Sequence, residues 1–404
     1  MKHLLLALLI ALTASVSSNA QTLQVDPIYI GGNATFNITN GAPLAVSVVC
    51  YSLAGSGPYT LANGLTFDLS MPIKLLPAMV LDISGNGQLG PFPVPNRAVA
   101  GMQLWFQAAH VDPLAPSTTT TNMVPMVVGD ASGSLVSWGD DWSGQVADTP
   151  VGNDFTQVSA GDMHSVALRA DGSLVSWGRD YELQVTDTPI GTDFIEVAAG
   201  GYHCLALKSN GTLLAWGSDS RQQVSDTPVG NDFAQVSAGG KYSVALKFDG
   251  TLVPWGDDWS NQVADTPVGN DFTQVSAGSW HAAALKSDGT LVSWGGDSDG
   301  SVVDTPVGND FTQVSAGGAH SVALRSDGSL VSWGRNDRHQ VTDTPVGTDF
   351  IQVSAGGAFS AALRSDGSLV SWGNDLSSQV TDTPVGTGFT DVSTGAYHSV
   401  AIKF

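Results

Sequence analysis

The chain has 404 residues, only 13% of them charged, and its formal net charge is −22 at pH 7. Such an acidic surface repels phosphate backbones, so nucleic acid is excluded as the expected partner. Glu182 and Glu196 are the only glutamates among the 37 acidic residues. Because aspartate favours turns and caps, this usage indicates an all-β, turn-rich chain.

Residues 1–20 have the pattern of an export signal. Lys2 precedes an apolar run at 4–16, and a small-residue cleavage pattern ends at Ala20. We expect cleavage near Ala20 and a secreted, bacterial extracellular product. The apolar run is too short for a comfortable membrane span and no later stretch approaches one, so we expect no membrane span.

Residues 21–128 contain no repeat and are predicted to form a small β-sandwich accessory domain. Runs typical of strands, ATFNIT, LAVSVVCYSL, GLTFDL and MQLWFQAAHV, are separated by Gly and Pro. The Thr-rich stretch 112–122 is either a linker or a loop before a last strand at 126–128, and we favour the loop. Cys50 and Cys204 fall in different modules, and we interpret both as small buried side chains rather than a disulfide.

Residues 129–404 are organised by a repeat of 39 residues. The pair Trp-Gly recurs at this spacing, and a second position that is usually His recurs in step with it. The Trp positions are Trp138, Trp177, Trp216, Trp255, Trp294, Trp333 and Trp372. The second positions are His164, His203, Tyr242, His281, His320, Phe359 and His398.

Each unit is predicted to contain three antiparallel strands, with a fourth possible in the connector. FTQVSAG is one strand, and HSVALRSDGSLVSWG is two strands joined by an Asp-Gly turn. Ser-Ala-Gly suits a crowded centre, whereas Trp suits a wider place where units pack face to face. Small sheets of this kind stack radially, and the two chain ends supply complementary strands of one unit. A closed seven-bladed β-propeller is therefore favoured over an open β-solenoid.

The repeat carries a family resemblance. The pattern V-[SA]-A-G-x-x-H-S-V-A-L-[RK]-x-D-G-S-L-V-S-W-G-x-[DN]-x-x-x-Q resembles the repeat of the regulator of chromosome condensation (RCC1) family of seven-bladed propellers. The short unit and the export signal are most similar to the secreted bacterial branch typified by β-lactamase inhibitory protein II. The resemblance implies three-stranded blades and a protein-binding face. It does not imply nucleotide exchange for an acidic, exported chain.

Two windows vary among the seven units: the five residues after Trp-Gly and the two residues before the His position. Strand direction places both windows at one end of the sheets. The constant Asp-Gly and Asp-Thr-Pro-Val-Gly segments are expected at the other end, as Asx turns rather than a cation-binding ring. The aspartates that begin the Asp-Thr-Pro segments are Asp148, Asp187, Asp226, Asp265, Asp304, Asp343 and Asp382.

The variable windows hold the candidate partner-binding residues. Aromatic and arginine side chains are typical of interface hot spots, and the equivalent positions of other units are often Ser, Gly or Ala. The candidates are Trp142, Trp259, Trp280, Tyr181, Tyr202, Tyr397, Arg179, Arg221, Arg335, Arg338, His339, Lys241, Met163 and Leu376. An alternative for Tyr202, Trp280 and Tyr397 is that they only shield the mouth of the central channel.

The remaining chemistry is sparse. Identical histidine positions in neighbouring blades form a ring rather than a tetrahedral cluster, so we expect them to support turns, with no metal. No motif of a hydrolase, metalloprotease or phosphate-binding loop occurs, so we expect no catalytic residues and no cofactor.

Two functions remain. The first is a monomeric, non-enzymatic scaffold that binds an extracellular protein through the variable end, with inhibition of that protein as one form of this function. The second is a carbohydrate-binding, lectin-like propeller in which tryptophans stack on sugar rings. Because a lectin tends to repeat one pocket in each blade and these windows differ, we favour the protein partner.

Overall fold

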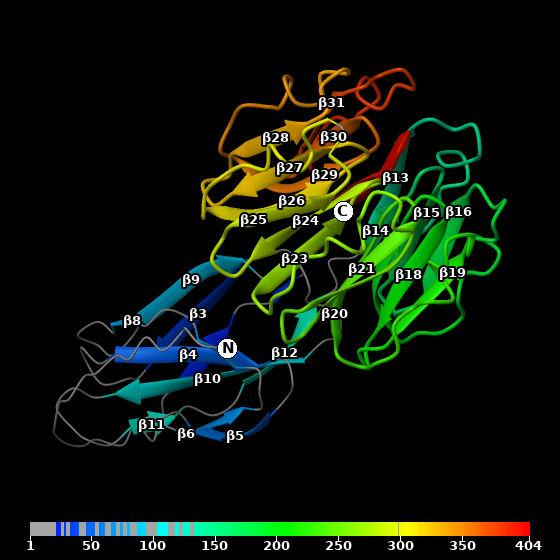
Figure 1. Cartoon of the computed structure of the whole chain (residues 1–404). Helices are drawn as coiled ribbons and strands as arrows, with labels where there is room; N and C mark the ends of the chain where they lie inside the picture. The colour runs from blue at the N-terminus through cyan, green and yellow to red at the C-terminus, as the bar shows by residue number, and fades with distance from the viewer. Residues whose placement is uncertain are drawn as a thin grey trace. The chain divides into compact units, whose positions relative to one another are not determined.

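The computed structural model describes residues 133–404 except Ser298 in full, and before them the backbone of the strands β1–β12 (Figure 1). Its contacts divide the chain into two compact units, Met1–Ala131 and Ser132–Phe404, and each is described by itself. The predicted export signal lies outside the described residues. Among the described residues, no helix has the length and hydropathy that a membrane crossing needs.

The strands of the N-terminal unit form two larger sheets and one hairpin. The sheets have the orders β1-β3-β9 and β2-β12-β10-β4-β7, with β11 beside β10 and β8 beside β4, and β5 pairs β6. The predicted loop 112–122 contains a short strand, β11, which pairs antiparallel with β10, so that part of the prediction is wrong. The bounds are β1 Thr22–Val25, β2 Ile28–Tyr29, β3 Asn33–Thr39, β4 Val46–Ser52, β5 Ser56–Thr60, β6 Thr66–Leu69, β7 Ile73–Leu75, β8 Met79–Val80, β9 Gly87–Pro93, β10 Gln103–Val111, β11 Thr118–Thr120 and β12 Val124–Gly129.

The C-terminal unit consists of seven three-stranded antiparallel sheets. The first strands are β14 Phe155–Ala160, β17 Phe194–Ala199, β20 Phe233–Ala238, β23 Phe272–Ala277, β26 Phe311–Ala316, β29 Phe350–Ala355 and β32 Phe389–Thr394. The second strands are β15 His164–Arg169, β18 His203–Lys208, β21 Tyr242–Lys247, β24 His281–Lys286, β27 His320–Arg325, β30 Phe359–Arg364 and β33 His398–Lys403. The third strands are β13 Ser134–Gly139, β16 Leu174–Gly178, β19 Leu213–Gly217, β22 Leu252–Gly256, β25 Leu291–Gly295, β28 Leu330–Gly334 and β31 Leu369–Gly373. The connectors form no fourth strand within residues 133–404.

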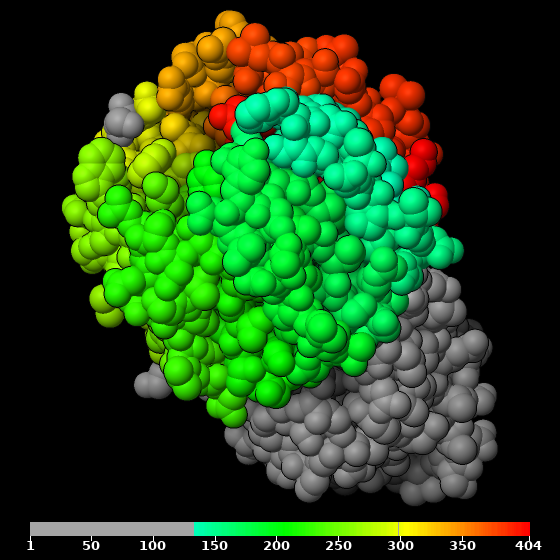
Figure 2. Space-filling model, turned by 90° about the vertical axis from the view of Figure 1, so that its right-hand side faces the viewer, coloured from blue at the N-terminus to red at the C-terminus, as the bar shows by residue number. Residues whose placement is uncertain are grey.

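One sheet is shared between the two ends of this unit. Its order is β13-β33-β32, so the third strand comes from the start of the unit and the other two from its end. The register runs from Ser134 opposite Lys403 to Gly139 opposite His398. Figure 2 shows the two ends, teal and red, side by side on the surface. The predicted sharing of one sheet by the two ends is confirmed.

A belt of backbone hydrogen bonds joins the seven sheets at the end of their first strands. The nitrogen of Asp162 donates to the oxygen of Gly200, and the equivalent bond is made at each step around the unit. The last of these bonds runs from Ala396 back to Gly161, at 3.2 Å. A Cβ atom at Gly317 would collide with the carbonyl oxygen of Gly356, so this approach requires glycine. The predicted crowding at Ser-Ala-Gly is confirmed.

The hydrophobic core lies between neighbouring sheets. In one cluster, Leu285 of β24 packs with Phe311 of β26 and Trp333 of β28. The indole nitrogen of Trp333 donates to the oxygen of Ser301 in the preceding connector, at 3.0 Å. Burial of one such aromatic ring stabilises the fold by about 2–3 kcal/mol, and the cluster recurs between the other sheets. The seven tryptophans of the Trp-Gly pairs belong to this core, as predicted.

Candidate functional site: the variable end of the sheets

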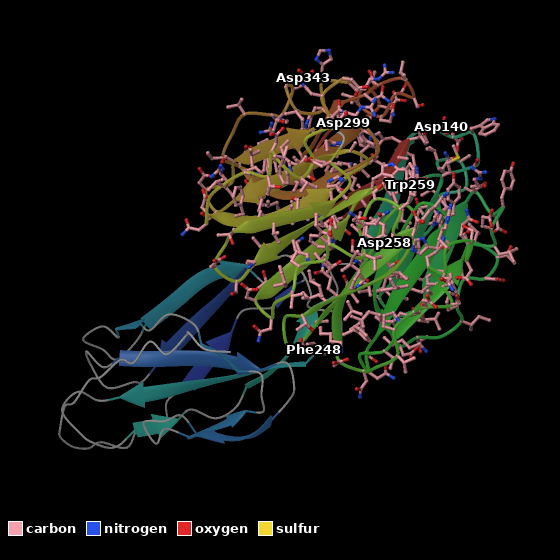
Figure 3. The ribbon with its side chains drawn as sticks, viewed as in Figure 1. Asp140, Phe248, Asp258, Trp259, Asp299 and Asp343 are labelled. Carbon is pink, nitrogen blue, oxygen red and sulfur yellow. The ribbon has the colours of Figure 1, made fainter. Side chains whose placement is uncertain are left out.

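The two variable windows meet at one end of the sheets, which we call the variable end. The amide of Arg179, in the first window, donates to the carbonyl of Met163, in the second, at 2.9 Å. The same bond forms from Asp257 to Lys241 and from Asp140 to Tyr397. Figure 3 shows Phe248, in the Asp-Gly turn after β21, apart from Asp258 and Trp259 in the turn after β22. The predicted placement of both windows is confirmed.

Two nearly constant side chains hold the variable turns in shape: an Asp, which is Asn336 in one turn, and a Gln, which is Ser301 in another. The carboxylate of Asp258 accepts from the amides of Val263 and Ala264, at 2.8 and 2.9 Å. The buried amide of Gln262 accepts from the backbone of Ser260, at 2.7 Å. In each turn, the residue before the Gln position has a positive φ. Five of these residues are not glycine: Leu183, Gln222, Asn261, His339 and Ser378. The frame fixes the backbone, so the side chains between its two anchors are free to differ.

The aspartate that begins Asp-Thr-Pro-Val-Gly belongs to this same turn. The amide of Asp148 donates to Gly144, and the hydroxyl of Thr149 donates to Ser137, near the variable end of β13. The chain then descends along the sheet, and Asp154 reaches the opposite end, where Arg169 pairs with it. The prediction that the whole segment lies at the opposite end is therefore wrong for its first aspartate, because the helical turn after Trp-Gly extends as far as that residue.

The predicted partner-binding residues differ in exposure. Trp142 and Trp259 are 79% and 82% exposed, while Trp280 and Tyr397 are close to half exposed. Tyr181 and Leu376 are also exposed. The exposed cationic candidates are Arg221, Arg335, Arg338 and His339, and the half-buried candidates are Met163, Arg179, Tyr202 and Lys241.

Arg179 organises one cluster of these residues. Its guanidinium lies 4.5 Å from the ring centroid of Tyr181 and 5.4 Å from that of Tyr202, so it stacks between two units. A guanidinium nitrogen also approaches the sulfur of Met163, at 3.2 Å. Burial raises the pKa of Asp162, and the charge of Arg179 opposes that rise. Four predicted residues therefore form one ordered patch.

A second cluster lies two units further along the chain. The rings of Trp259 and Trp280 meet edge to face with centroids 6.0 Å apart. In the adjoining turn, Arg221 is 3.6 Å from the carboxylate of Asp257, which is 8% exposed. Further along, Arg335 pairs with Asp337 within one turn, at 2.7 Å. The structure thus brings together several candidates that the repeat pattern alone could not connect.

The carboxylates of the opposite, constant end are engaged by ion pairs and hydrogen bonds within the unit. Arg325 binds both oxygens of Asp310 and stacks on Phe311, with 4.7 Å to the ring centroid. In the Asp-Gly turns, Asp327 accepts from the amide and hydroxyl of Ser329, and the hydroxyl bond above all lowers the pKa of Asp327. These contacts are the predicted Asx turns. They occupy the carboxylates with backbone and side-chain donors.

The histidines join neighbouring sheets rather than supporting their own turns, which corrects the prediction. The Nε2 atom of His281 lies 2.7 Å from the hydroxyl of Ser321 in the next sheet. His164, His203, His320 and His398 make the same contact with Cys204, Ser243, Ser360 and Ser165. Burial lowers the pKa of His203 to about 3 and that of His281 to about 4, so both are neutral at pH 7.

Tyr242 and Phe359 interrupt this series of histidine contacts, and they differ in the residue that faces them. Tyr242 faces Ala282, which has no hydroxyl, and the tyrosine instead donates to the carbonyl of His281, at 2.6 Å. Phe359 leaves the hydroxyl of Ser399 buried without a partner. Cys204 is fully buried and burial raises its pKa, so it fills a serine position as predicted. The side chain of Cys50 lies outside the described residues.

Within residues 133–404, Ser298 apart, no group of three His, Cys, Asp or Glu side chains is arranged to hold a metal ion. Sequence reasoning missed one surface feature. A Val or Ile after each Thr-Pro is almost fully exposed, at 92–102% for Val151, Ile190, Val229, Val268, Val307, Val346 and Val385. Its signal is a hydrophobic residue kept in all seven connectors, next to proline and glycine.

Comparisons with known proteins identify the repeat. Residues 155–184, 194–223, 272–301, 311–340 and 350–379 match the regulator of chromosome condensation (RCC1) repeat. Each match starts at the first strand and ends at the last residue of the variable-turn frame. No curated protein sequence matches the chain.

Solved structures with a similar fold include several propellers. Prp20p from Saccharomyces cerevisiae is 19% identical with a TM-score of 0.56, over 68% of this chain and 92% of that chain. Human WBSCR16 is 15% identical with a TM-score of 0.55, over 67% and 99%. The ectodomain of the Physcomitrella patens receptor kinase CR4 is 20% identical with a TM-score of 0.54, over 62% and 70%. The chain thus has RCC1-like repeats, built as three-stranded blades, and structural neighbours with the RCC1 propeller fold.

Proposed function

We propose that the C-terminal unit is a closed seven-bladed propeller that binds a protein partner through its variable end. The observation that carries this proposal is the concentration of ordered, exposed aromatic and cationic side chains in turns whose backbone is fixed by constant residues. Pre-ordered aromatic and arginine anchors lose little entropy on binding. The cation stacked between Tyr181 and Tyr202 and the paired rings of Trp259 and Trp280 have this character.

Structural neighbours support a binding role. Prp20p is described together with its binding to Gsp1p and histones, and yeast RCC1 (Prp20) has been solved bound to Kap60. We extend to this chain only the class of activity, recognition of a protein by a propeller. In this proposal the chain acts outside the cell after removal of residues 1–20, binds without catalysis, and inhibits its partner by covering the partner's surface. Residues 21–128 form a β-sandwich that accompanies this propeller.

A carbohydrate ligand is the second candidate. The observation that favours it is the exposure of Trp142 and Trp259 at the same position of two turns, each beside carboxylates such as Asp140 and Asp258. Stacking on sugar rings would use such an arrangement. Because the third turn of this kind has Ser220 and the sixth has Asp337, the pocket is not repeated, and the protein partner has the stronger support.

The test uses substitutions that other units already contain. Trp142→Ser and Trp259→Ser copy Ser220, and Trp280→Ala copies Ala319. We expect the full chain to capture a protein from the culture supernatant of its source. We expect the triple variant to lose that capture with the melting temperature changed by less than about 3 °C, because exposed rings contribute little to stability.

A matched control removes an exposed ring from the constant end. Phe248→Ser changes a 74% exposed residue to the one found at Ser287, and capture should be unaffected. A glycan array run in parallel decides between the two candidates. Glycan binding without a captured protein would replace the proposed function by the second candidate. If the triple variant still captured the protein, the variable end would not be the binding surface in either candidate function.

A further inference from the structure

Each of the seven sheets has two edge strands, and side chains of a neighbouring sheet bond the edge amides of the first strand, as Gln157 does with the amide of Val197. The third strand of every sheet pairs with the second strand only. Unpaired edges of this kind present free backbone donors and acceptors and are recognised by extended peptides when nothing covers them. The edge is formed by backbone groups of the third strand and not by side chains of the variable turns, so it is a separate feature from the function proposed above.

The outward groups can be assigned in β25. The backbone amide of Lys286 donates to the carbonyl of Thr290 at 2.9 Å, and that of Gly296 donates to the carbonyl of Trp280 at 2.8 Å. The backbone groups of the even-numbered residues of β25 therefore face β24. The backbone groups of Leu291, Ser293 and Gly295 consequently face outward. Among the described residues they have no backbone partner, because the connector bonds within itself, as from Thr305 to Val302.

The strand β22, which is the third strand of its sheet, shows that the outward N–H has no role in folding. Pro254 takes the place of Ser293 there and lacks an N–H, yet β22 keeps its length and its register opposite Val244. Proline is tolerated in a sheet only where the missing N–H faces away from a paired strand. The equivalent residues of the other sheets are Ser137, Ser176, Ala215, Ser293, Ser332 and Ser371.

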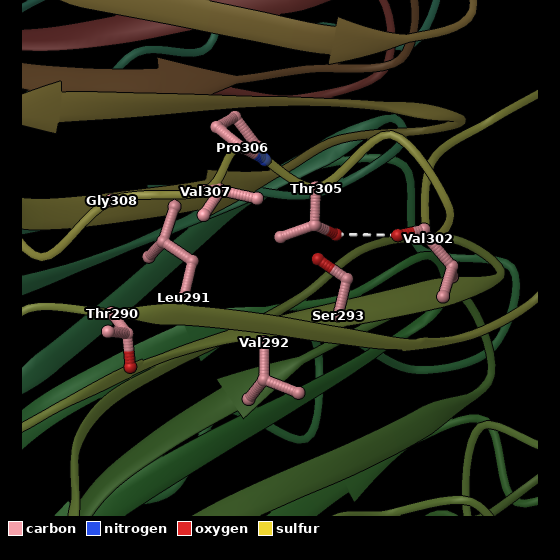
Figure 4. A pocket seen from close by; sticks show the side chains of 9 residues that line it. All are labelled: Thr290, Leu291, Val292, Ser293, Val302, Thr305, Pro306, Val307 and Gly308. Atoms are coloured by element: carbon pink, nitrogen blue, oxygen red, sulfur yellow. Dashed lines mark hydrogen bonds between the residues drawn. The ribbon is translucent and has the colours of Figure 1, made fainter.

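A groove runs along this edge. Beside β25 it has a volume of about 340 Å³ and is lined by Leu291, Ser293, Val302, Pro306 and Val307 among others. Figure 4 shows the side chains of Leu291 and Ser293 pointing from the strand toward the connector. The hydroxyl of Ser293 is buried without a partner. An equivalent groove of about 310 Å³ lies beside β19, so the feature is present in at least two sheets.

Two kinds of exposed side chain flank the groove. Val307 is 98% exposed, so it contributes nothing to the core of the isolated chain, and its equivalents are exposed in all seven connectors. Asp288 and Asp304 are exposed near the two ends of the strand and its connector. A second copy of this chain would bring the same carboxylates and a charge of −22 against them, which opposes pairing between copies.

We infer that these rim grooves bind an extended segment of a partner protein by strand addition. The segment pairs with the outward groups of the third strand, places aliphatic side chains against the valine of the connector, and carries Lys or Arg at its ends. Six of the seven sheets have the required N–H, and the sheet with Pro254 does not. The rim is thus a multivalent site for aliphatic, cationic strands.

The probe is the peptide acetyl-Lys-Val-Thr-Val-Thr-Val-Lys-amide, titrated calorimetrically into the full chain. A sixfold variant replaces Ser137, Ser176, Ala215, Ser293, Ser332 and Ser371 by Pro, copying Pro254. We expect binding of up to six peptides to the natural chain and at least about a tenfold loss of affinity in the variant, since each strand loses a backbone donor. Replacing the two peptide lysines by glutamates should weaken binding about tenfold at low salt.

The reverse variant, Pro254→Ser, guards against failure of the sixfold variant to fold. It restores the missing donor and should raise the number of bound peptides by one. Absence of peptide binding at millimolar concentration, or binding that ignores both proline changes, would overturn the inference. Concentration-dependent self-association that the prolines abolish would assign the edges to a second copy instead. None of these outcomes depends on the variable end, so the proposed function stands or falls separately.

Discussion

The belts around the axis and the turns at the variable end obey opposite rules within the same 39 residues. In the belts, nearly every residue matches a partner in the next sheet, as Gly317 does with Gly356 and His281 with Ser321, and Phe359 beside the unpaired Ser399 is an exception. In the turns, Asp258 and Gln262 hold the backbone, and the residues between them meet no such demand. The comparison teaches that variation among internal copies marks freedom from inter-sheet contacts, which is where recognition can evolve.

The largest expected effect is in the glycine belt. In Gly317→Ala the new Cβ collides with a backbone oxygen, which cannot move without opening the ring. We expect a loss of about 3 kcal/mol in the free energy of unfolding, at the upper end of overpacking costs. Urea denaturation measures it. Gly386→Ala is the control, because a Cβ there meets nothing within 4 Å and the cost is only that of a φ of 101°. Equal losses in the two variants would show that the belt carries no special constraint.

The next effect, compared residue by residue, is an acid sensitivity of the buried histidines that join the sheets. Five buried histidines have folded pKa values of about 3 to 4, below the ordinary 6.5. The unfolded chain therefore binds more protons in this window, so stability is complete above pH 6.5 and falls as the pH is lowered. At pH 5 each of these histidines lowers the free energy of unfolding by about 2 kcal/mol.

A matched variant isolates one histidine. His203→Phe with Ser243→Ala removes the pair without leaving an orphan hydroxyl, and Phe359 shows that the ring fits the site. We expect the variant to lose about 1 kcal/mol at pH 7, from the missing hydrogen bond, and to be less sensitive between pH 6.5 and 4. Thermal melting across this range measures both. An unchanged dependence on pH would mean that His203 is not the titrating group.

The strands of the C-terminal unit were predictable because the sequence of each repeat shows the pattern of its own three strands. The strand boundaries, the Asp-Gly turn and the buried tryptophan follow from alternation and turn chemistry, and the repeat extends them to every sheet. The end at which Trp142 and Tyr202 lie follows from strand direction alone. These features depend on neighbours along one unit, which a sequence displays directly.

The histidine contacts between sheets were not predicted because their partners lie 40 residues apart, one unit plus one residue. Periodicity shows that units are alike but not which residue of one touches which residue of the next. A signal was nevertheless present: where the histidine becomes Tyr242, the serine of the next unit becomes Ala282. Likewise, the stacking of Arg179 on both Tyr181 and Tyr202 depends on side-chain directions that a pattern does not carry.

The smallest effect concerns one exception in the belts, Asp391. Gln157 bonds both the amide and the carbonyl of Val197 in the next sheet, at 3.0 and 3.4 Å. Asp391 occupies the equivalent place facing Val158 and can only accept, at 3.2 Å from that amide. Burial raises its pKa, although the bond from Gln352 opposes the rise. A raised folded pKa means that this carboxyl stabilises the fold at acid pH and loses that contribution as the pH rises.

Asp391→Gln should therefore stabilise the protein by about 1 kcal/mol at pH 7, because the neutral amide avoids the buried charge and supplies the missing donor. The gain should shrink as the pH is lowered and the native carboxyl takes up its proton. Urea unfolding at pH 7 and pH 4 measures the difference, with Gln352→Asp as the matched reverse change in the neighbouring sheet. A variant that is less stable than the natural chain at pH 7 would show that the seam between β32 and β14 requires the carboxylate.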